Sequence, residues 1–133
     1  MSQAAPSQQP HRQTVEQQRA AFALECVRKV KREAFASKYR QLVRGLPAMI
    51  LTNGLGQTLA FLKAKGGEKS NEHQTAYTHL SAWAREQLRF GPDLLEQITR
   101  MDVSQYRLAQ TETLAVLGWL KRFADAELPE GKS

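Results

Sequence analysis

The segment at residues 38–65, KYRQLVRGLPAMILTNGLGQTLAFLKAK, decides the fold of this chain. It contains the longest run of uncharged residues, 45–62, with basic residues on both flanks. The Gly-Leu-Pro step at residues 45–47 and the Asn-Gly step at residues 53–54 are typical helix breakers, because proline has no backbone N–H and Asn-Gly tolerates a positive φ. The segment is therefore predicted to form a set of short helices and not one long rod.

The apolar side chains of this segment recur at helical spacings, which predicts that it supplies the middle of the hydrophobic core. These side chains are Leu42, Val43, Leu46, Met49, Ile50, Leu55, Leu59, Phe61 and Leu62. A run of 18 uncharged residues also has the length of a membrane span. The internal helix breakers and the cationic residues on both sides favour a buried helical hairpin instead.

Two blocks of sequence carry a family resemblance. The first block has Leu46 and Pro47, then Asn-Gly-Leu at 53–55 and Thr-Leu-Ala-Phe-Leu at 58–62, and it closes with Lys63 and Lys65. The second block has Tyr-Arg-Leu at 106–108, Thr-Glu-Thr-Leu at 111–114 and Trp-Leu-Lys-Arg-Phe at 119–123. Together the blocks resemble the small helical subunit of the type III-B (RAMP-module, Cmr-type) CRISPR effector complex over residues 19–126. Neither block is a catalytic signature.

The resemblance implies a non-enzymatic, all-helical protein of the cytoplasm that acts in antiviral defence. It also implies that several copies stack along the duplex of guide RNA and target RNA. The expected partners are the RAMP backbone subunits, the large subunit, further copies of this chain and the two RNAs. The resemblance implies neither a membrane partner nor a small-molecule substrate.

Length and charge agree with a small binding protein. The 133 residues suffice for one domain with a core of its own. The formal net charge of +6 is uneven, because residues 1–69 contain 12 basic and 4 acidic side chains, whereas residues 70–133 contain 7 and 9. This asymmetry suggests one face for polyanions and another for proteins, although basic residues can also simply solubilise helix faces.

The predicted organisation is a disordered N-terminal segment at 1–12, a single helical domain at 13–127 and a frayed tail at 128–133. The polar, Gln-rich N-terminus has no apolar stretch of the kind found in signal peptides. Cys26 is the only cysteine, so an intramolecular disulfide is impossible, as expected for a reducing cytoplasm. Its place among apolar residues predicts a small buried side chain rather than a nucleophile.

Residues that typically start and end helices predict an all-α bundle of about five or six helices. A capping box from Thr14 to Gln17 starts a first helix that is expected to reach residue 36. Beyond the loop at 66–70, Ser70 or Asn71 caps a helix that ends near residue 89, and Pro92 opens a short helix to residue 100. A second capping box at 102–105 starts the last helix, which is expected to end near residue 127.

Three residues do not fit the amphipathic pattern of their helices. Arg19 and Glu33 project into the apolar arc of the first helix, yet about 21 Å of helix separates them, so they cannot pair with each other. Each therefore lies at an edge of the core, or contacts another helix or another subunit. Leu114 projects onto the polar face of the last helix.

The chain carries no pattern typical of an active site. Gly54, Leu55 and Gly56 lack the spacing of a P-loop and follow no predicted strand. His73 and His79 are six residues apart, which does not match the i, i+4 spacing of a helical zinc site. We therefore expect no catalytic residue, no metal site and no cofactor.

Basic residues are the expected carriers of RNA binding, through the phosphate backbone and not the bases. Those in or beside the matching blocks rank first: Lys38, Arg40, Arg44, Lys63, Lys65, Arg107, Lys121 and Arg122. Arg28, Lys31 and Arg32 on the polar face of the first helix rank lower, and Arg19 is included only for its unusual position. The alternative is a small basic regulatory or adaptor protein that binds DNA or an acidic protein partner.

Overall fold

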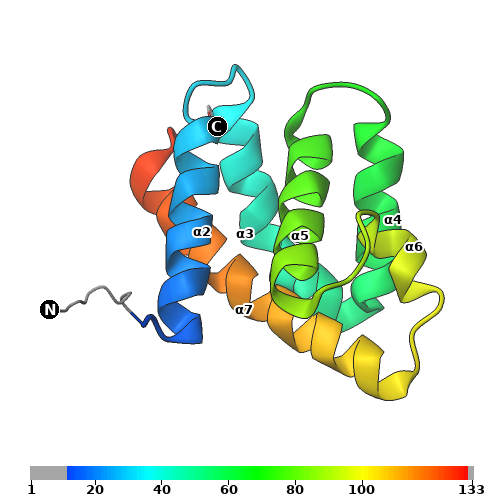
Figure 1. Cartoon of the computed structure of the whole chain (residues 1–133). Helices are drawn as coiled ribbons and strands as arrows, with labels where there is room; N and C mark the ends of the chain where they lie inside the picture. Colours follow the sequence, from blue (N-terminus) through cyan, green and yellow to red (C-terminus); the bar gives the residue numbers. More distant parts are fainter. Residues whose placement is uncertain (1–11, 132–133) are drawn as a thin grey trace, which may run out of the picture.

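The chain folds into six helices within residues 12–131, the part that the computed structural model describes (Figure 1). No strand occurs between residues 12 and 131, so the predicted all-α class is confirmed. All but the last residue of the predicted disordered segment 1–12 lies outside the described part, as do residues 132 and 133. The helices are α2 (Val15–Val30), α3 (Ala36–Asn53), α4 (Leu55–Gly66), α5 (Glu72–Leu88), α6 (Leu94–Ile98) and α7 (Val103–Glu127).

Helix α2 begins at the predicted capping box but ends six residues earlier than the sequence indicated. The Thr14 hydroxyl accepts a hydrogen bond from the backbone N–H of Gln17 at 3.0 Å, and the Gln17 side chain accepts one from the Thr14 N–H at 2.9 Å. Val30 is the last buried residue of the helix, and Ala34, which lies within the predicted helix, is exposed. Residues 31–34 are all exposed, so a longer helix would gain no burial there, and the chain turns into α3.

Helix α3 passes through Pro47 without a break, which corrects the prediction that residues 45–47 end a helix. Proline removes one backbone hydrogen bond and strains the preceding turn. However, the fully buried side chains of Val43, Leu46 and Ile50 lie on one face on both sides of the proline. Burial of that continuous stripe offsets the local cost, as tertiary packing often overrides local preference.

The predicted break at Asn53 and Gly54 is confirmed, and α7 completes it. Gly54 has φ 89°, a conformation that favours glycine, and it separates α3 from α4 by one residue. A glycine has no side chain to cap the start of α4. Instead, the backbone N–H of Leu55 donates to Gln110 Oε1 at 3.0 Å and that of Gly56 donates to Tyr106 Oη at 3.0 Å.

Helices α4 and α5 pack closely where glycine permits it. A Cβ at Gly66 would lie 2.8 Å from the backbone nitrogen of Gln74 in α5, closer than packed atoms can approach. Asn71 caps α5 by accepting from the N–H of Gln74 at 2.8 Å, which confirms the predicted start of this helix. The α4–α5 pair is therefore a tight antiparallel hairpin (Figure 1).

The remaining helices follow the predicted order, but α6 is shorter at both ends than the predicted helix at 92–100. Pro92 does not start α6, because Asp93 is its N-cap and Leu94 its first residue. Helix α7 has the predicted bounds, with a capping box formed by Asp102 and Gln105. Figure 1 shows α7, yellow to red, running obliquely across the other helices, and it packs against α2, α3 and α5.

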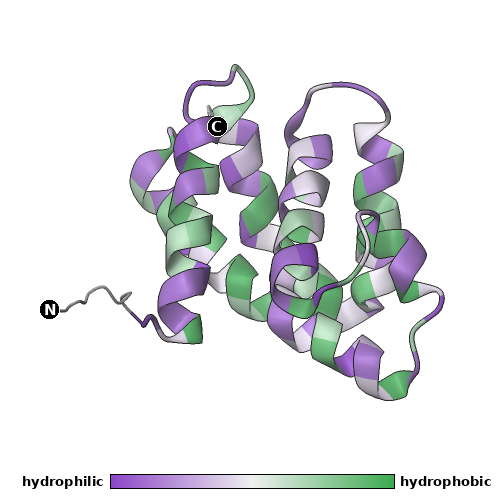
Figure 2. Cartoon of the chain, in the orientation of Figure 1, coloured by the Kyte–Doolittle hydropathy of each residue, from purple (hydrophilic) through white to green (hydrophobic). Residues whose placement is uncertain are grey.

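One hydrophobic core joins the helices. Green hydrophobic bands recur along α2, α4 and α7 between purple hydrophilic ones, as amphipathic packing requires (Figure 2). Six of the nine predicted core residues of the central segment are buried, whereas Leu42, Met49 and Phe61 lie half-buried at its edge. Leu114, which was predicted on the polar face of α7, also packs against the core. Its side chain makes a contact at the side of the helix and is not an exposed apolar residue.

The residue that follows α7 is held more firmly than predicted. Leu128, the first residue of the expected frayed tail, is 4% exposed and belongs to the core. Its carbonyl accepts a hydrogen bond from Arg40 Nη1 at 3.0 Å.

Between residues 12 and 131, no helix is both long enough and apolar enough to cross a membrane.

Candidate nucleic-acid interface

The predicted RNA-binding residues divide into two groups according to whether a carboxylate of the same chain already binds them. Five of them form ion pairs in the structure: Arg19, Lys31, Arg40, Arg44 and Lys63. The other seven are exposed and have no ion-pair partner among residues 12–131: Arg28, Arg32, Lys38, Lys65, Arg107, Lys121 and Arg122. A cation without an internal partner offers its full charge to a ligand, so the second group matters more for polyanion binding.

The acidic partner of Arg19 explains the place of this cation in an apolar arc. Its Nε and Nη2 donate to the two carboxylate oxygens of Glu112 on α7 at 2.7 and 2.8 Å. Trp83 Nε1 on α5 donates to the same carboxylate at 2.8 Å, and Arg19 Nη1 reaches Glu16 at 2.8 Å. The hydrogen bond with Arg19 lowers the pKa of Glu112, and the reciprocal bond raises that of Arg19. This cluster joins α2, α5 and α7.

Arg40 and Arg44 of α3 both bind Asp125 near the end of α7. Arg40 Nε lies 3.2 Å and Arg44 Nη2 lies 3.1 Å from Asp125 Oδ1. The hydrogen bond from Arg44, with that from Arg40, lowers the pKa of Asp125. Arg40 is largely covered, whereas about half of the Arg44 side chain is exposed, so only Arg44 has donors free to meet a second anion.

Lys63 on α4 belongs to a polar cluster with the segment before α6. Its Nζ lies 3.2 Å from Asp93 Oδ2 and 5.4 Å from the centre of the Tyr77 ring. The Tyr77 hydroxyl donates to the other oxygen of Asp93 and accepts from the N–H of Leu95 at 3.0 Å. The bond from Tyr77 is the main reason that the pKa of Asp93 is lowered. An RNA phosphate that reaches Lys63 must compete with this carboxylate.

Lys31, by contrast, is weakly held. Its Nζ lies 3.7 Å from Glu127 and the side chain is largely exposed. Exposed pairs of this kind contribute little to stability. Lys31 therefore remains available beside Arg28 and Arg32, which flank a shallow hollow on the outer side of α2.

Helix α7 presents three of the unpaired cations on one side. Arg107, Lys121 and Arg122 are all exposed, as are Thr111 and Gly118 between them. Lys38 lies near the start of α3 and Lys65 near the end of α4, so these two belong to other parts of the surface. The unpaired cations thus form several basic areas and not one continuous patch.

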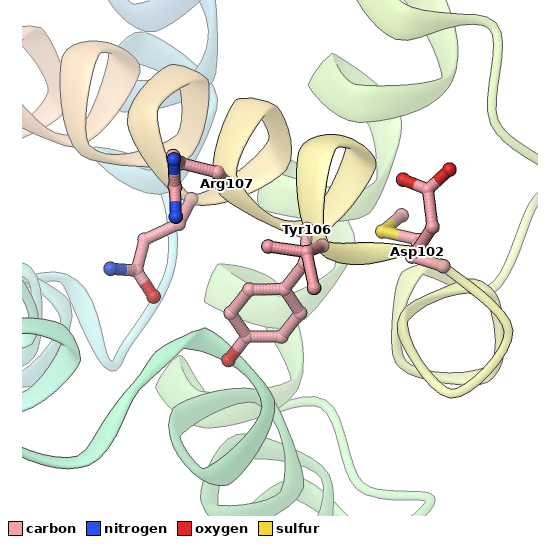
Figure 3. A pocket seen from close by; sticks show the side chains of 6 residues that line it. Asp102, Tyr106 and Arg107 are labelled. Carbon is pink, nitrogen blue, oxygen red and sulfur yellow. The ribbon is translucent and has the colours of Figure 1, made fainter.

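Several polar groups of the hollow beside the start of α7 are already bonded within the chain. Tyr106 points from α7 toward the start of α4, while Asp102 and Arg107 lie on either side of it (Figure 3). The Tyr106 hydroxyl and the side-chain oxygen of Gln110 already accept hydrogen bonds from backbone N–H groups of α4. Asp102 is likewise occupied as the cap of α7. Tyr106 and Gln110 therefore hold the α3–α4 junction in place, whereas Arg107 has no ion-pair partner between residues 12 and 131.

Titratable side chains elsewhere are buried for structural reasons. Burial raises the pKa of the Cys26 thiol to about 12, as expected for a structural cysteine. His79 is kept neutral, because burial lowers its pKa to about 4, and its Nδ1 lies 2.8 Å from the hydroxyl of Tyr39. Among residues 12–131 no group of three or more His, Cys, Asp or Glu side chains could hold a metal ion.

The sequence analysis named the cations that form these ion pairs but none of their acidic partners. Glu112, Asp125 and Asp93 lie 93, 85 and 30 residues from Arg19, Arg40 and Lys63. The one signal available was the misplaced Arg19, which required a partner on another helix or another subunit. The other misfit, Glu33, lies exposed in the turn after α2.

Comparison with known proteins gives consistent matches along most of the chain. Residues 15–127 match the family model of the CRISPR-associated protein Cas_Cmr5. The CRISPR system Cmr subunit Cmr5 of Thermus thermophilus is 31% identical over 112 residues, which cover 84% of this chain and 93% of that relative. The Cmr subunit Cmr5 of Thermotoga maritima is 30% identical over 112 residues, with coverages of 82% and 81%.

The fold is also similar to that of a solved structure. The crystal structure of a CRISPR-associated Cmr5 family protein from Thermus thermophilus aligns with a TM-score of 0.73 and 28% sequence identity. The alignment covers 87% of this chain and 98% of that one.

Proposed function

The chain belongs to the Cmr5 family of CRISPR-associated proteins, and we propose that it is the non-catalytic small subunit of a type III-B CRISPR effector complex that targets RNA in antiviral defence. In this role, copies of the chain stack along the duplex of guide RNA and target RNA, beside the RAMP backbone subunits and the large subunit. Its basic surface contacts the phosphate backbone. The observation that carries the RNA contact is the set of seven exposed cations that have no ion-pair partner between residues 12 and 131.

Binding through phosphates agrees with the position of the aromatic side chains. Tyr39 and Trp83 are buried, and Trp119 is half-buried and stacked on Phe123 with ring centres 5.5 Å apart. Base stacking requires exposed aromatic faces beside basic residues. Lysine and arginine contacts to phosphates neutralise charge and carry no sequence information directly. The subunit therefore supports RNA of any guide sequence.

A sequence-specific DNA reader receives less support, although α3 and α4 are joined by the tight turn that a helix-turn-helix needs. The first turn of α4 would have to enter the major groove. Leu55 and Leu59 are fully buried, and Tyr106 and Gln110 occupy the amides at the start of the helix. This end of α4 is therefore covered by its own chain.

The test is charge reversal at two unpaired cations that lie in or beside the matching blocks. In a complex reconstituted with the Lys38→Glu/Lys65→Glu subunit, target RNA should bind more weakly, and the slope of log affinity against log salt should become shallower by about 1.5 to 2. The fold should be unchanged, because neither lysine has an internal partner within residues 12–131. Lys69→Glu/Arg85→Glu is the control with the same change in charge, since both residues are exposed and neither has an ion-pair partner among residues 12–131, and it should retain RNA.

Three outcomes would contradict the proposal. Unchanged RNA capture and salt slope in the Lys38/Lys65 variant would exclude these residues as phosphate contacts. Loss of the variant subunit from the complex, with RNA capture retained, would identify the two lysines as protein contacts. A flat salt response together with strong preference for one DNA sequence would instead support a regulatory protein.

A further inference from the structure

Helices α3 and α7 contact each other along a line that reaches the surface of the molecule. Arg40 and Arg44 of α3 bind Asp125 of α7, with Arg44 Nη2 at 3.1 Å from Asp125 Oδ1. Just after the end of α3, the backbone N–H of Leu55 donates to Gln110 Oε1 at 3.0 Å. Because the start of α3 meets the end of α7 and its end meets an earlier turn of α7, the two helices run antiparallel.

This geometry places Leu51 of α3 opposite Leu114 of α7. Leu51 lies seven residues after Arg44, so it is on the side of α3 that faces Asp125. Leu114 lies eleven residues before Asp125, so it is on the side of α7 that faces Arg44. Each leucine is also one helical turn away from the bonded pair beyond the end of α3, so the two side chains lie at the same level.

The two leucines belong to an apolar group on the surface. Leu51 is 72% exposed and Leu114 is half-buried at the edge of the core. Val103 lies eleven residues before Leu114 on the same side of α7, and it is 71% exposed. We call these three side chains the apolar seam. Exposed apolar side chains with a polar rim are typical of surfaces that bind another protein.

Two cations border the apolar seam. Arg107 and Lys121 lie seven residues before and after Leu114, on the same side of α7 and about 21 Å apart along the helix. Both are exposed, and neither has an ion-pair partner among residues 12–131. The acids at the two ends of this side are engaged within the chain, because Asp125 binds α3 and Asp102 caps α7. Arg107 and Lys121 can therefore meet acidic groups of a partner.

The combination of apolar and cationic groups fits a protein better than a nucleic acid. A phosphodiester backbone has no apolar group to cover Leu51, and bases stack on aromatic faces and not on aliphatic side chains. An acidic amphipathic helix matches both features. Its apolar stripe can cover the apolar seam, while carboxylates on either side of that stripe meet Arg107 and Lys121. A second copy of this chain matches poorly, because its formal net charge is +6.

We propose that the apolar seam docks an acidic amphipathic helix of a neighbouring protein subunit. Leu51 is the central anchor, and Arg107 and Lys121 fix the orientation of the docked helix by charge. This inference rests on the proposed function, since the partner belongs to the assembled complex. It assigns Arg107 and Lys121 to protein binding and leaves the other five unpaired cations to RNA.

The first test introduces a charge into the apolar seam. In a complex reconstituted from purified components, Leu51→Glu should raise the subunit concentration for half-maximal incorporation about tenfold, equivalent to about 1.4 kcal/mol. Because Leu51 is 72% exposed, the isolated variant should keep its helical circular dichroism and cooperative unfolding. Leu108→Glu is the matched control, since Leu108 is 52% exposed on another side of α7, and it should be incorporated like the wild type. Wild-type incorporation of Leu51→Glu would overturn the inference.

The second test identifies the partner by cross-linking. The photoreactive amino acid p-benzoylphenylalanine replaces Leu51, and the irradiated complex is analysed by mass spectrometry. The expected cross-link is to a helix of another subunit in which Asp or Glu residues flank an apolar stripe. A cross-link to RNA, to a second copy of this chain or to a basic segment would overturn the inference, as would the absence of a cross-link.

The third test separates protein docking from RNA binding. Arg107→Glu/Lys121→Glu should weaken incorporation most at low salt, because salt screens charged contacts. At a subunit concentration that fills the complex, this variant should retain target RNA like the wild type. Weaker RNA retention with unchanged incorporation would overturn the inference and make these two residues RNA contacts. A wild-type subunit that does not enter the complex at all would instead refute the proposed function itself.

Discussion

The ion pair between Arg19 and Glu112 should be essential for the stability of the isolated subunit. The substitution that tests it is Arg19→Met, which keeps the length and the apolar stem of the side chain. It leaves the Glu112 carboxylate, whose side chain is only 9% exposed, with a single hydrogen bond from Trp83. An ionised carboxylate without a cation in such a place is strongly unfavourable.

The expected cost follows from the exposure of the two side chains. Removing one partner of a fully buried pair costs about 3–5 kcal/mol. The Arg19 side chain is 21% exposed, so water can partly solvate the space that it leaves. We therefore expect a loss of about 2–3 kcal/mol in the free energy of unfolding, which lowers the Tm by roughly 10 °C for a domain of this size.

The double variant Arg19→Met/Glu112→Gln is the matched control. Glutamine is neutral and its carbonyl oxygen can still accept the hydrogen bond from Trp83, so no charge is left without a partner. Replacement of a buried ion pair by neutral groups is often close to neutral in stability. The double variant should therefore regain most of the loss and lie within about 1 kcal/mol of the wild type.

The assay is urea unfolding followed by tryptophan fluorescence, repeated at several pH values. Arg19 holds the pKa of Glu112 below its ordinary 4.5. The stability from this pair is therefore complete above about pH 4.5 and is lost as the pH falls through the lowered pKa. The gap between wild type and Arg19→Met should narrow in acid. A loss below about 1 kcal/mol at pH 7, or a double variant less stable than Arg19→Met, would refute this reasoning.

Two further predictions concern the fold. Gly66→Ala should lower the free energy of unfolding by about 1–3 kcal/mol, because the new Cβ would lie 2.8 Å from the backbone nitrogen of Gln74; greater stability in a denaturant titration would show that the α4–α5 pair yields easily. Wild-type stability should fall by about 2 kcal/mol between pH 7 and pH 5, because the pKa of His79 is about 4 in the folded chain and 6.5 when exposed. Since unfolding then takes up a proton that the folded protein does not bind, His79→Gln should flatten this dependence, and an unchanged pH profile would exclude His79 as its source.

The sequence determined those parts of the fold that depend on a few neighbouring residues. The caps at Thr14 and Asp102 and the break at Gly54 were predicted correctly, and Asn71 is one of the two caps predicted for α5. Each is formed mainly by groups within four positions along the chain, so side-chain type and spacing are sufficient to predict it. The same local periodicity predicted the all-α class and most of the buried residues.

Where local signals conflict, the outcome depended on tertiary packing. Tertiary packing also determined which cations have a carboxylate partner in the chain. Helix α3 continues through Pro47 because a buried stripe on both sides of it outweighs the local strain. Of the twelve cations predicted to bind RNA, five are held by carboxylates that come from other turns or helices, and in the case of Arg19 the partner lies 93 residues away. Sequence spacing does not fix which distant acid meets a given base, since that depends on how the helices cross. Position along the helix predicted that a cation is on the surface, but only packing determined whether its charge is available.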